Sequence, residues 1–345
     1  MDRLNMRNRP LQIGILGAAN IARNFIAGVA PSKILTVAAV ASRDPAKAEA
    51  FARETGVPRF HGSYEALLAD REIDAVYIPL PNSLHAEWAI RAAESGKPIL
   101  CEKPLAVTGK EGRRMFAAAR ANNVPLVEAY PYLAQVQTAK LREMIATGAI
   151  GKVKLIRSSF GITSVDPANI RLSPSLGGGA LLDAGSYAMS LIRIVAGERP
   201  ARVQAAASFA ANGVDLTTIA NIAFPSGLLA QMSCSFETGY HRHALIGGDR
   251  GVIETNFLNH PPASGPAILQ VKRGIAFGAA FEPLDVPDGN GFLREAESFA
   301  ASLCNGPVRW TGATEAESLD ILDSLDAIRA SAQTGAWVEL SEWQC

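Results

Sequence analysis

An aspartate and a tyrosine, Asp183 and Tyr187, are spaced so that they could act on one substrate. They lie four residues apart in "SPSLGGGALLDAGSYAMSLIRIVAG", residues 173–197, and so share one face of the helix that this run predicts. Side chains of these types directed into a crevice can hold a carbonyl oxygen and protonate it. The alternative is an ordinary helix, with the tyrosine on its core face and Asp183 near the positive N-terminal end.

A lysine follows a glutamate at the end of a short apolar run. The stretch "ILCEKPLAVT", residues 99–108, places Glu102, Lys103 and Pro104 directly after Cys101. Charged side chains are rarely buried unless they are paired, and proline cannot donate to a strand ladder, so this is not ordinary core sequence. The stretch therefore marks Lys103 as a further candidate for function.

The start of the chain predicts a dinucleotide-binding unit. "LQIGILGAANIARNFIAGVA", residues 11–30, reads as an apolar strand, a turn of small residues and a helix. Such a turn lets backbone N–H groups approach a pyrophosphate, and the helix N-terminus adds positive dipole. The middle glycine of the usual GxGxxG pattern is replaced by alanine, so a plain strand–turn–helix stays an alternative. The candidate cofactor residues here are Gly17, Ala19, Asn20 and Ile21.

The end of the second expected strand, residues 35–41, bears on the choice of cofactor. An acid at this place accepts from the ribose 2′-hydroxyl of NAD, whereas a small polar residue followed by arginine suits the 2′-phosphate of NADP. Ser42 and Arg43 fit the second case. The alternative is that Arg43 is a solvated loop residue and that Asp44 takes the ribose.

Strands alternate with helices up to about residue 130, which predicts a parallel sheet with helices on both faces. Ligands of such sheets lie beyond the carboxyl ends of the strands. Lys103 falls at one such end, so its ammonium is expected to face a ligand crevice. The residues at these ends are Pro81, Asn82, His85, Glu102 and Lys103.

The alternation stops near residue 150, and the remainder reads mainly as strands. We therefore expect an α/β Rossmann domain over residues 1–130 and an α+β domain over residues 131–345. The second domain should hold a large, mostly antiparallel open sheet for substrate binding and oligomerisation. Helices are expected near residues 290–304 and 314–333, the latter near the domain junction.

The EKP motif after a strand, "GGGALLDAGSY" and the degraded dinucleotide turn occur in one order along the chain. With "YIPLPNSLHAEWAIRAAESGKPILCEKPLA", they resemble the glucose–fructose oxidoreductase / inositol dehydrogenase / MocA family, written Gfo/Idh/MocA, over nearly the whole chain. Tyr187 in place of histidine resembles the branch with glucose–fructose oxidoreductase, dihydrodiol dehydrogenase and NADP-dependent xylose dehydrogenase.

The resemblance implies an NADP(H)-dependent oxidoreductase, with NAD(H) as the alternative, acting on a CH–OH or carbonyl group of a sugar or similar polyol. It implies Tyr187 as the acid/base, Lys103 at the reacting oxygen and Asp183 at the substrate hydroxyls. A nearby ammonium stabilises a phenolate and so lowers a tyrosine pKa from its ordinary value of roughly 10. The residues implied to line the nicotinamide ribose are Pro81, Asn82, His85 and Glu102.

Other polar residues have two interpretations each. Asn169 and Arg171 could reach substrate hydroxyls or a carboxylate, or could anchor their loop. His241 and His243 have a spacing that can bind metal, but no third ligand with suitable spacing is visible, so no metal is expected. The cysteines, of which Cys101 adjoins the EKP motif, form no CxxC pair and predict reduced thiols in a cytoplasmic protein.

Charge and hydropathy limit the classes of partner that this chain could bind. The 33 basic and 33 acidic residues balance, which argues against nucleic acid, and no apolar run is long enough for a membrane span. A sheet face left uncovered by helices would be an exposed apolar patch, so a homodimer or homotetramer through the second domain is expected. Alternatives to a sugar dehydrogenase are a non-catalytic dinucleotide-binding regulator and a dihydrodiol, keto-sugar or imine reductase.

Overall fold

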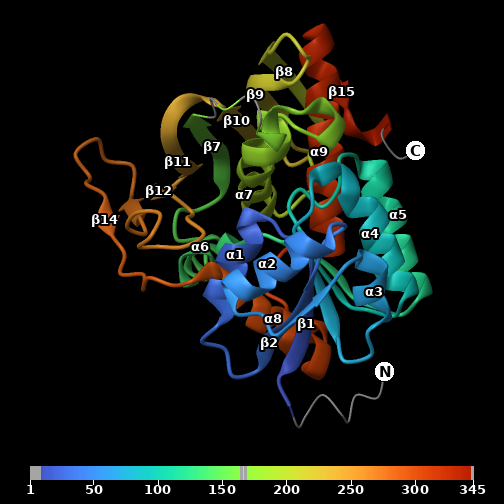
Figure 1. The fold of residues 1–345 in the computed structure, drawn as a ribbon. Coiled ribbons are helices and arrows are strands. Elements are labelled where there is room, and N and C mark those ends of the chain that lie inside the picture. Colours follow the sequence, from blue (N-terminus) through green and yellow to red (C-terminus); the bar gives the residue numbers. More distant parts are fainter. Residues whose placement is uncertain (1–8, 164–165, 167–168, 343–345) are drawn as a thin grey trace. The chain divides into compact units, whose positions relative to one another are not determined.

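The computed structural model describes residues 9–163, 166 and 169–342, which fall into two compact units (Figure 1). Residues 290–315, which the sequence-based division placed in the second domain, belong to the first unit by their contacts. The first unit comprises residues 9–105, 111–134 and 290–315, and the second comprises residues 106–110, the described part of 135–289, and 316–342.

The first unit is built on a parallel sheet of six strands in the order β3-β2-β1-β4-β5-β6. β4 and β5 are buried at every position, as expected of a sheet covered on both faces. The strand order reverses between β1 and β4, where such sheets bind ligands beyond the strand ends. The strands are β1 (Leu11–Leu16), β2 (Leu35–Ala41), β3 (Arg59–His61), β4 (Ala75–Ile78), β5 (Ile99–Glu102) and β6 (Leu126–Ala129).

Helices complete the core of this unit. Phe25 of α1 stacks on Tyr77 with ring centroids 4.0 Å apart, and its edge meets Phe292 of α8 at 5.9 Å. This aromatic contact fixes α8 against the first sheet. The helices are α1 (Asn20–Val29), α2 (Pro45–Thr55), α3 (Tyr64–Ala69), α4 (Asn82–Glu94), α5 (Gly109–Ala121) and α8 (Gly291–Asn305), with the short η2 (Pro131–Ala134) and η6 (Pro307–Arg309).

The second unit is built on a sheet of nine strands in the order β14-β13-β12-β11-β7-β10-β9-β8-β15. Every pair is antiparallel except β10 with β7, which is parallel. The strands are β7 (Val153–Thr163), β8 (Arg202–Phe209), β9 (Asp215–Ala223), β10 (Leu229–Ser235), β11 (Glu237–Gly248), β12 (Gly251–Thr255), β13 (Leu269–Arg273), β14 (Glu282–Pro283) and β15 (Val338–Glu339). The predicted fold class, a Rossmann sheet and a large, mostly antiparallel sheet, is confirmed.

One face of the large sheet is covered by helices and the other is open. Along β10, Ala230, Met232 and Cys234 are buried, whereas Leu229 is 55% exposed. α7 (Ser186–Ala196) packs on β7 and β10 from the buried side. The other helices of this unit are α6 (Val136–Ala146), α9 (Glu315–Thr334), the π-helical η5 (Leu181–Gly185) and the short η3 (Ile170–Leu172), η4 (Pro174–Leu176) and η7 (Leu340–Glu342).

One helical stretch has the length and composition of a membrane span, contrary to the sequence-based expectation. It runs from Pro174 to Ala196, and it is the only such stretch among the described residues. The structure buries 83% of its most apolar window. The apolar character of this stretch is therefore explained by its place in the core beneath the large sheet.

Candidate functional site

The turn after β1 needs a glycine at its first position. Gly17 has φ +124°, a conformation that favours glycine, and a Cβ there would lie 3.0 Å from Leu80 Cδ2. Ala19 stands at the N-cap of α1 without a side-chain hydrogen bond, and Asn20 and Ile21 open the helix. The N-cap residue of α1 therefore has no side chain that accepts from the first N–H groups of the helix. Helix N-termini that bind anions offer such N–H groups to the ligand. The substitution of glycine by Ala19 is accommodated in an extended conformation, φ −98°.

The end of β2 separates the two interpretations of the ribose site. Asp44 caps α2, because its Oδ1 accepts from the N–H groups of Ala46 at 2.9 Å and Lys47 at 3.2 Å. Arg43 is exposed, and its charge and hydrogen bond oppose the rise that burial causes in the pKa of Tyr64. The Asp44 carboxylate is therefore engaged with a helix, while Arg43 is exposed and directly follows Ser42 in the chain, which favours a 2′-phosphate site.

The EKP loop after β5 is held from both sides. His85 is fully buried, with Nδ1 2.9 Å from the Pro104 carbonyl and Nε2 2.8 Å from the Leu80 carbonyl. Burial lowers the pKa of His85, against the effect of these carbonyls, and the charge of Lys103 lowers it further. Glu128 Oε1 accepts the Leu105 N–H at 2.9 Å. His85 thus braces the loop from the α4 side, next to Pro81 and Asn82.

Glu102 is the third support of this loop. It is 8% exposed, accepts a hydrogen bond from the Tyr77 hydroxyl at 2.6 Å, and accepts the Lys103 N–H at 3.2 Å. The backbone of Lys103 is therefore fixed by the side chain of the residue before it. This arrangement explains why the sequence places a glutamate directly before the lysine.

A buried carboxyl group on α8 faces the same acids. Glu295 is 1% exposed, and neither of its carboxyl oxygens has a hydrogen-bond partner among the described residues. Burial and the charges of Glu102 and Glu128 raise the pKa of Glu295 well above its ordinary value. Its neutral form is therefore favoured in the folded protein.

Replacing Glu295 by glutamine should stabilise the protein at neutral pH. A raised folded-state pKa means that the folded form binds the proton more tightly, so stability falls as the pH rises from about 4.5 towards that pKa. Glutamine keeps the shape without the charge, and the expected gain is on the order of 1 kcal/mol or more at pH 7.5, vanishing near pH 4. Urea unfolding across this range measures it. Glu297→Gln, on the same helix, is the control, and a gain equal at every pH would contradict the assignment.

In the second unit, the loop before Asp183 brings two predicted residues to it. Arg171 Nε donates to Asp183 Oδ2 at 2.7 Å, with the arginine side chain 44% exposed and the aspartate 17%. Asn169 Oδ1 accepts the Arg171 N–H at 3.0 Å. Asn169 therefore anchors its loop, which was one of the two interpretations of this residue. The anchored loop holds Arg171 in hydrogen-bond contact with the Asp183 carboxylate.

Asp183 lies in a π-helical turn and not in the regular α-helix that the sequence predicted. The turn begins where Asp215 of β9 accepts the Leu181 N–H at 2.7 Å. It ends at Gly185, where a Cβ would lie 3.1 Å from Cys234 Sγ, so the chain runs close to the sheet. Such π-turns are frequent at functional sites, because they re-aim side chains within a helix.

Tyr187, one residue into α7, is 6% exposed. Asn259 Nδ2 donates to its hydroxyl oxygen at 2.9 Å, and the Arg242 guanidinium lies 4.2 Å from its ring centroid. Sequence reasoning did not single out Asn259 or Arg242. A signal for Arg242 existed, because it occupies the inward position between two outward histidines of β11.

Those histidines face the open side of the large sheet. His241 Nε2 lies 2.8 Å from Ser159 Oγ, and its Nδ1 lies 3.0 Å from the Gly239 carbonyl. Within the described part of the chain, no group of three or more His, Cys, Asp or Glu side chains could hold a metal ion. Burial raises the pKa of the Cys101 thiol well above its usual range, which makes it a poor nucleophile.

Comparison with known families supports the same fold. The description "Oxidoreductase family, NAD-binding Rossmann fold" matches residues 11–130, and "GFO/IDH/MocA C-terminal domain" matches residues 138–254. The chain belongs to the GFO/IDH/MocA oxidoreductase family. The resemblance read from the sequence is thereby confirmed, and the chain is an NAD(P)-dependent oxidoreductase.

Relatives within the GFO/IDH/MocA family match over nearly their whole length. D-xylose 1-dehydrogenase (NADP(+)) 2 of Haloferax volcanii is 36% identical and covers 96% of this chain and 100% of its own. The aldose-aldose oxidoreductase of Caulobacter crescentus, solved with glycerol, has a TM-score of 0.86 at 27% identity, over 96% of this chain and 100% of its own. The 3-ketoreductase KijD10 of Actinomadura kijaniata, solved with NADP and TDP-benzene, has a TM-score of 0.84 at 30% identity, over 94% and 98%.

Proposed function

We propose that this protein is an NADP(H)-dependent oxidoreductase acting on a CH–OH or carbonyl group of a sugar or similar polyol. The observation that carries the proposal is the setting of Tyr187, whose oxygen accepts a hydrogen bond from Asn259 in a chain of this family. The xylose dehydrogenase, aldose oxidoreductase and sugar 3-ketoreductase relatives support a carbohydrate-like substrate.

Each site residue has one task in the proposed reaction. Tyr187 gives a proton to the substrate oxygen during reduction and takes it during oxidation. Lys103 stabilises charge that develops on that oxygen. Asp183, held by Arg171, accepts hydrogen bonds from substrate hydroxyls. When bound, the nicotinamide supplies or receives the hydride.

The proposed cofactor residues follow the two turns and the strand ends of the first unit. The capping role of Asp44 and the exposed Arg43 favour NADP(H), and NAD(H) stays the alternative. The relatives solved with NADP support the same choice. The residues that would hold the cofactor are Gly17, Ala19, Asn20, Ile21, Ser42, Arg43, Pro81, Asn82, His85, Glu102 and Lys103.

Nicotinamide absorbance tests the proposal. Purified protein is incubated with NADP⁺ or NAD⁺ and xylose, glucose, arabinose or galactose, and then with NADPH and keto-sugars or a dihydrodiol-type ring. Steady NADPH formation or consumption with one substrate supports the proposal. Silence in both directions, with cofactor bound, favours a non-catalytic regulator. Undiminished turnover in both Lys103→Ala and Tyr187→Phe would contradict the assigned roles.

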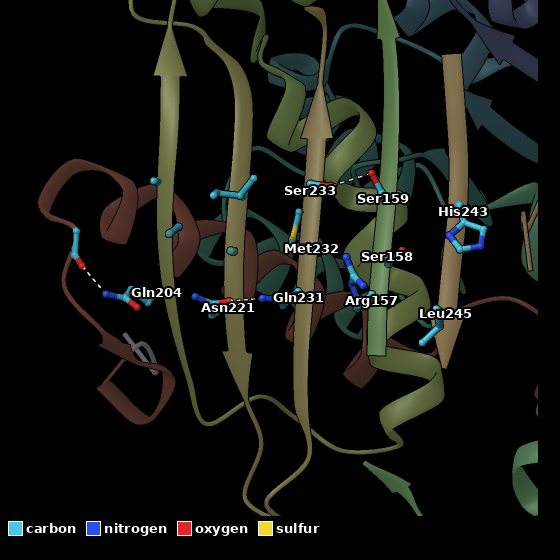
Figure 2. A pocket seen from close by; sticks show the side chains of 15 residues that line it. Arg157, Ser158, Ser159, Gln204, Asn221, Gln231, Met232, Ser233, His243 and Leu245 are labelled. Carbon is cyan, nitrogen blue, oxygen red and sulfur yellow. Dashed lines mark hydrogen bonds between the residues drawn. The ribbon is translucent and has the colours of Figure 1, made fainter. Parts of the chain in front are cut away.

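We further propose that the open face of the large sheet binds a second copy of this chain. Figure 2 shows this face with helices behind it: Gln204, Asn221, Gln231 and Arg157 point outward from four adjacent strands. They line a shallow hollow of about 630 Å³. Ile219, on β9 with Asn221, and Leu229, on β10 with Gln231, are 56% and 55% exposed, which is typical of an interface and costly in a monomer.

Leu229→Asp should convert a dimer or tetramer to monomers, because it places charge in an apolar contact. Light scattering after gel filtration measures the mass. Phe60→Asp, which replaces an exposed apolar residue of β3 in the first unit, is the control and should leave the mass unchanged. A wild-type monomer at micromolar concentration would refute the interface.

The free thiols of Cys101, Cys234 and Cys304 are in keeping with the proposed cytoplasmic location.

A further inference from the structure

A buried arginine lies against the ring of the proposed acid/base. Most of β11 from Glu237 to His243 is exposed, but Arg242 is 7% exposed. Its guanidinium carbon lies 4.2 Å from the centroid of the Tyr187 ring, 4.5 Å from that of Phe257 and 5.0 Å from that of Phe160. A guanidinium stays protonated at every working pH, so a permanent positive charge adjoins this tyrosine.

Asn259 joins the arginine to the tyrosine oxygen. Arg242 Nη1 lies 3.3 Å from Asn259 Oδ1, and Asn259 Nδ2 lies 2.9 Å from the Tyr187 hydroxyl. The backbone of Asn259 is fixed in turn, since its carbonyl accepts from Gln135 Nε2 at 2.6 Å. The amide thus bridges the two side chains from a held position.

The chemistry of arginine decides which way this amide faces. Arginine only donates hydrogen bonds, so the oxygen of Asn259 must face Arg242. The NH₂ group must then face Tyr187, whose oxygen accepts. The hydroxyl proton of Tyr187 is consequently not directed at Asn259 and can be aimed at a substrate.

We propose that Arg242 and Asn259 are positioning residues for Tyr187, which orient its hydroxyl proton and stabilise its phenolate form. The inference deepens the proposed function, because it rests on Tyr187 as the acid/base. A cation beside an aromatic ring and a hydrogen bond donated to its oxygen both favour the anion over the phenol.

Other described groups near Tyr187 and Asn259 in the second unit do not supply this charge. β7 contributes the uncharged ring of Phe160, at 5.7 Å between centroids. Burial and the charge of Arg242 lower the pKa of His260, next to Asn259, to about 4, so it is neutral at working pH. Asp183, one turn before Tyr187, is paired with Arg171. Among these described groups, the cation at the tyrosine ring is Arg242.

Tyrosinate absorbance tests the inference without substrate or cofactor. The full-length protein is titrated with base, and the Tyr187→Phe titration is subtracted to isolate Tyr187. The midpoint of Tyr187 in the unsubstituted protein is the reference. Arg242→Met should raise the midpoint by about one unit or more. Asn259→Leu should raise it less, and Arg242→Lys should restore part of the shift. Lys154→Met, which removes an exposed cation from β7, should leave it unchanged.

The outcomes separate the two proposals. An unchanged midpoint in both Arg242→Met and Asn259→Leu overturns the inference, even if Tyr187→Phe has lost its turnover. If the midpoint rises in Arg242→Met and Asn259→Leu but Tyr187→Phe keeps full turnover, the result contradicts the proposed function instead. If Arg242→Met does not fold, Arg242→Lys and Asn259→Leu decide. With D-xylose as the probe of oxidation, the rising limb of kcat should move to higher pH in the same variants, whereas a merely structural role would lower kcat equally at every pH.

Discussion

Tyr187→Phe is expected to lower kcat by about 10²–10⁴-fold, the usual contribution of a positioned acid/base. The substitution removes one oxygen from a side chain that is 6% exposed, so the ring should keep its packing against Phe160 and Arg242. The donor of Asn259 loses its acceptor, which should cost about 1–3 kcal/mol of stability and no more. Initial rates with the best substrate of the panel measure the effect on kcat.

Tyr240→Phe is the matched control for this loss. Tyr240 is 58% exposed and also makes an edge-to-face contact with Phe160, at 6.2 Å between centroids. Its hydroxyl has no role in the proposed chemistry, so kcat should stay within about twofold. NADPH binding, followed by fluorescence, should be the same in both variants. A tenfold or smaller loss in Tyr187→Phe would point to another proton donor.

The first unit was largely predictable because its signals are local. A strand, a turn of small residues and a helix follow one another within residues 11–30, and the structure forms β1 and α1 there. Asp44 followed by proline is a local helix start, and in the structure Asp44 caps α2. Features that depend only on residues close together in the chain could therefore be predicted from the sequence.

Features that depend on distant partners were missed. The π-turn at Asp183 requires the carboxylate of Asp215, more than thirty residues later, so the local pattern indicated an ordinary α-helix. Asn259 reaches Tyr187 from the loop after β12. The amphipathic pattern of α8 shows that one face is buried, but only the contact of Phe292 with Phe25 shows against which sheet. Such pairings carry no periodicity that one sequence reveals.

Gly179→Ala should destabilise the second unit by about 3 kcal/mol or more and disturb the site. Gly179 has φ +122°, and a Cβ there would fall on Asp215 Oδ1. The strained backbone accounts for about 1–3 kcal/mol. Displacing Asp215 from the Leu181 N–H and from Thr218 Oγ1, at 2.7 and 3.2 Å, accounts for a similar amount. Urea unfolding measures the total.

Gly197→Ala separates backbone strain from the contact with Asp215. Gly197 also has a positive φ, +69°, where it ends α7, but a Cβ there would meet no atom within 4 Å. It should therefore cost only about 1–2 kcal/mol and leave kcat unchanged. Because Asp215 holds the start of the turn that carries Asp183, Gly179→Ala should lower kcat/KM as well, even at temperatures where it is fully folded. Equal losses of stability in the two variants, with normal turnover in both, would show that the Asp215 contact does not position the site.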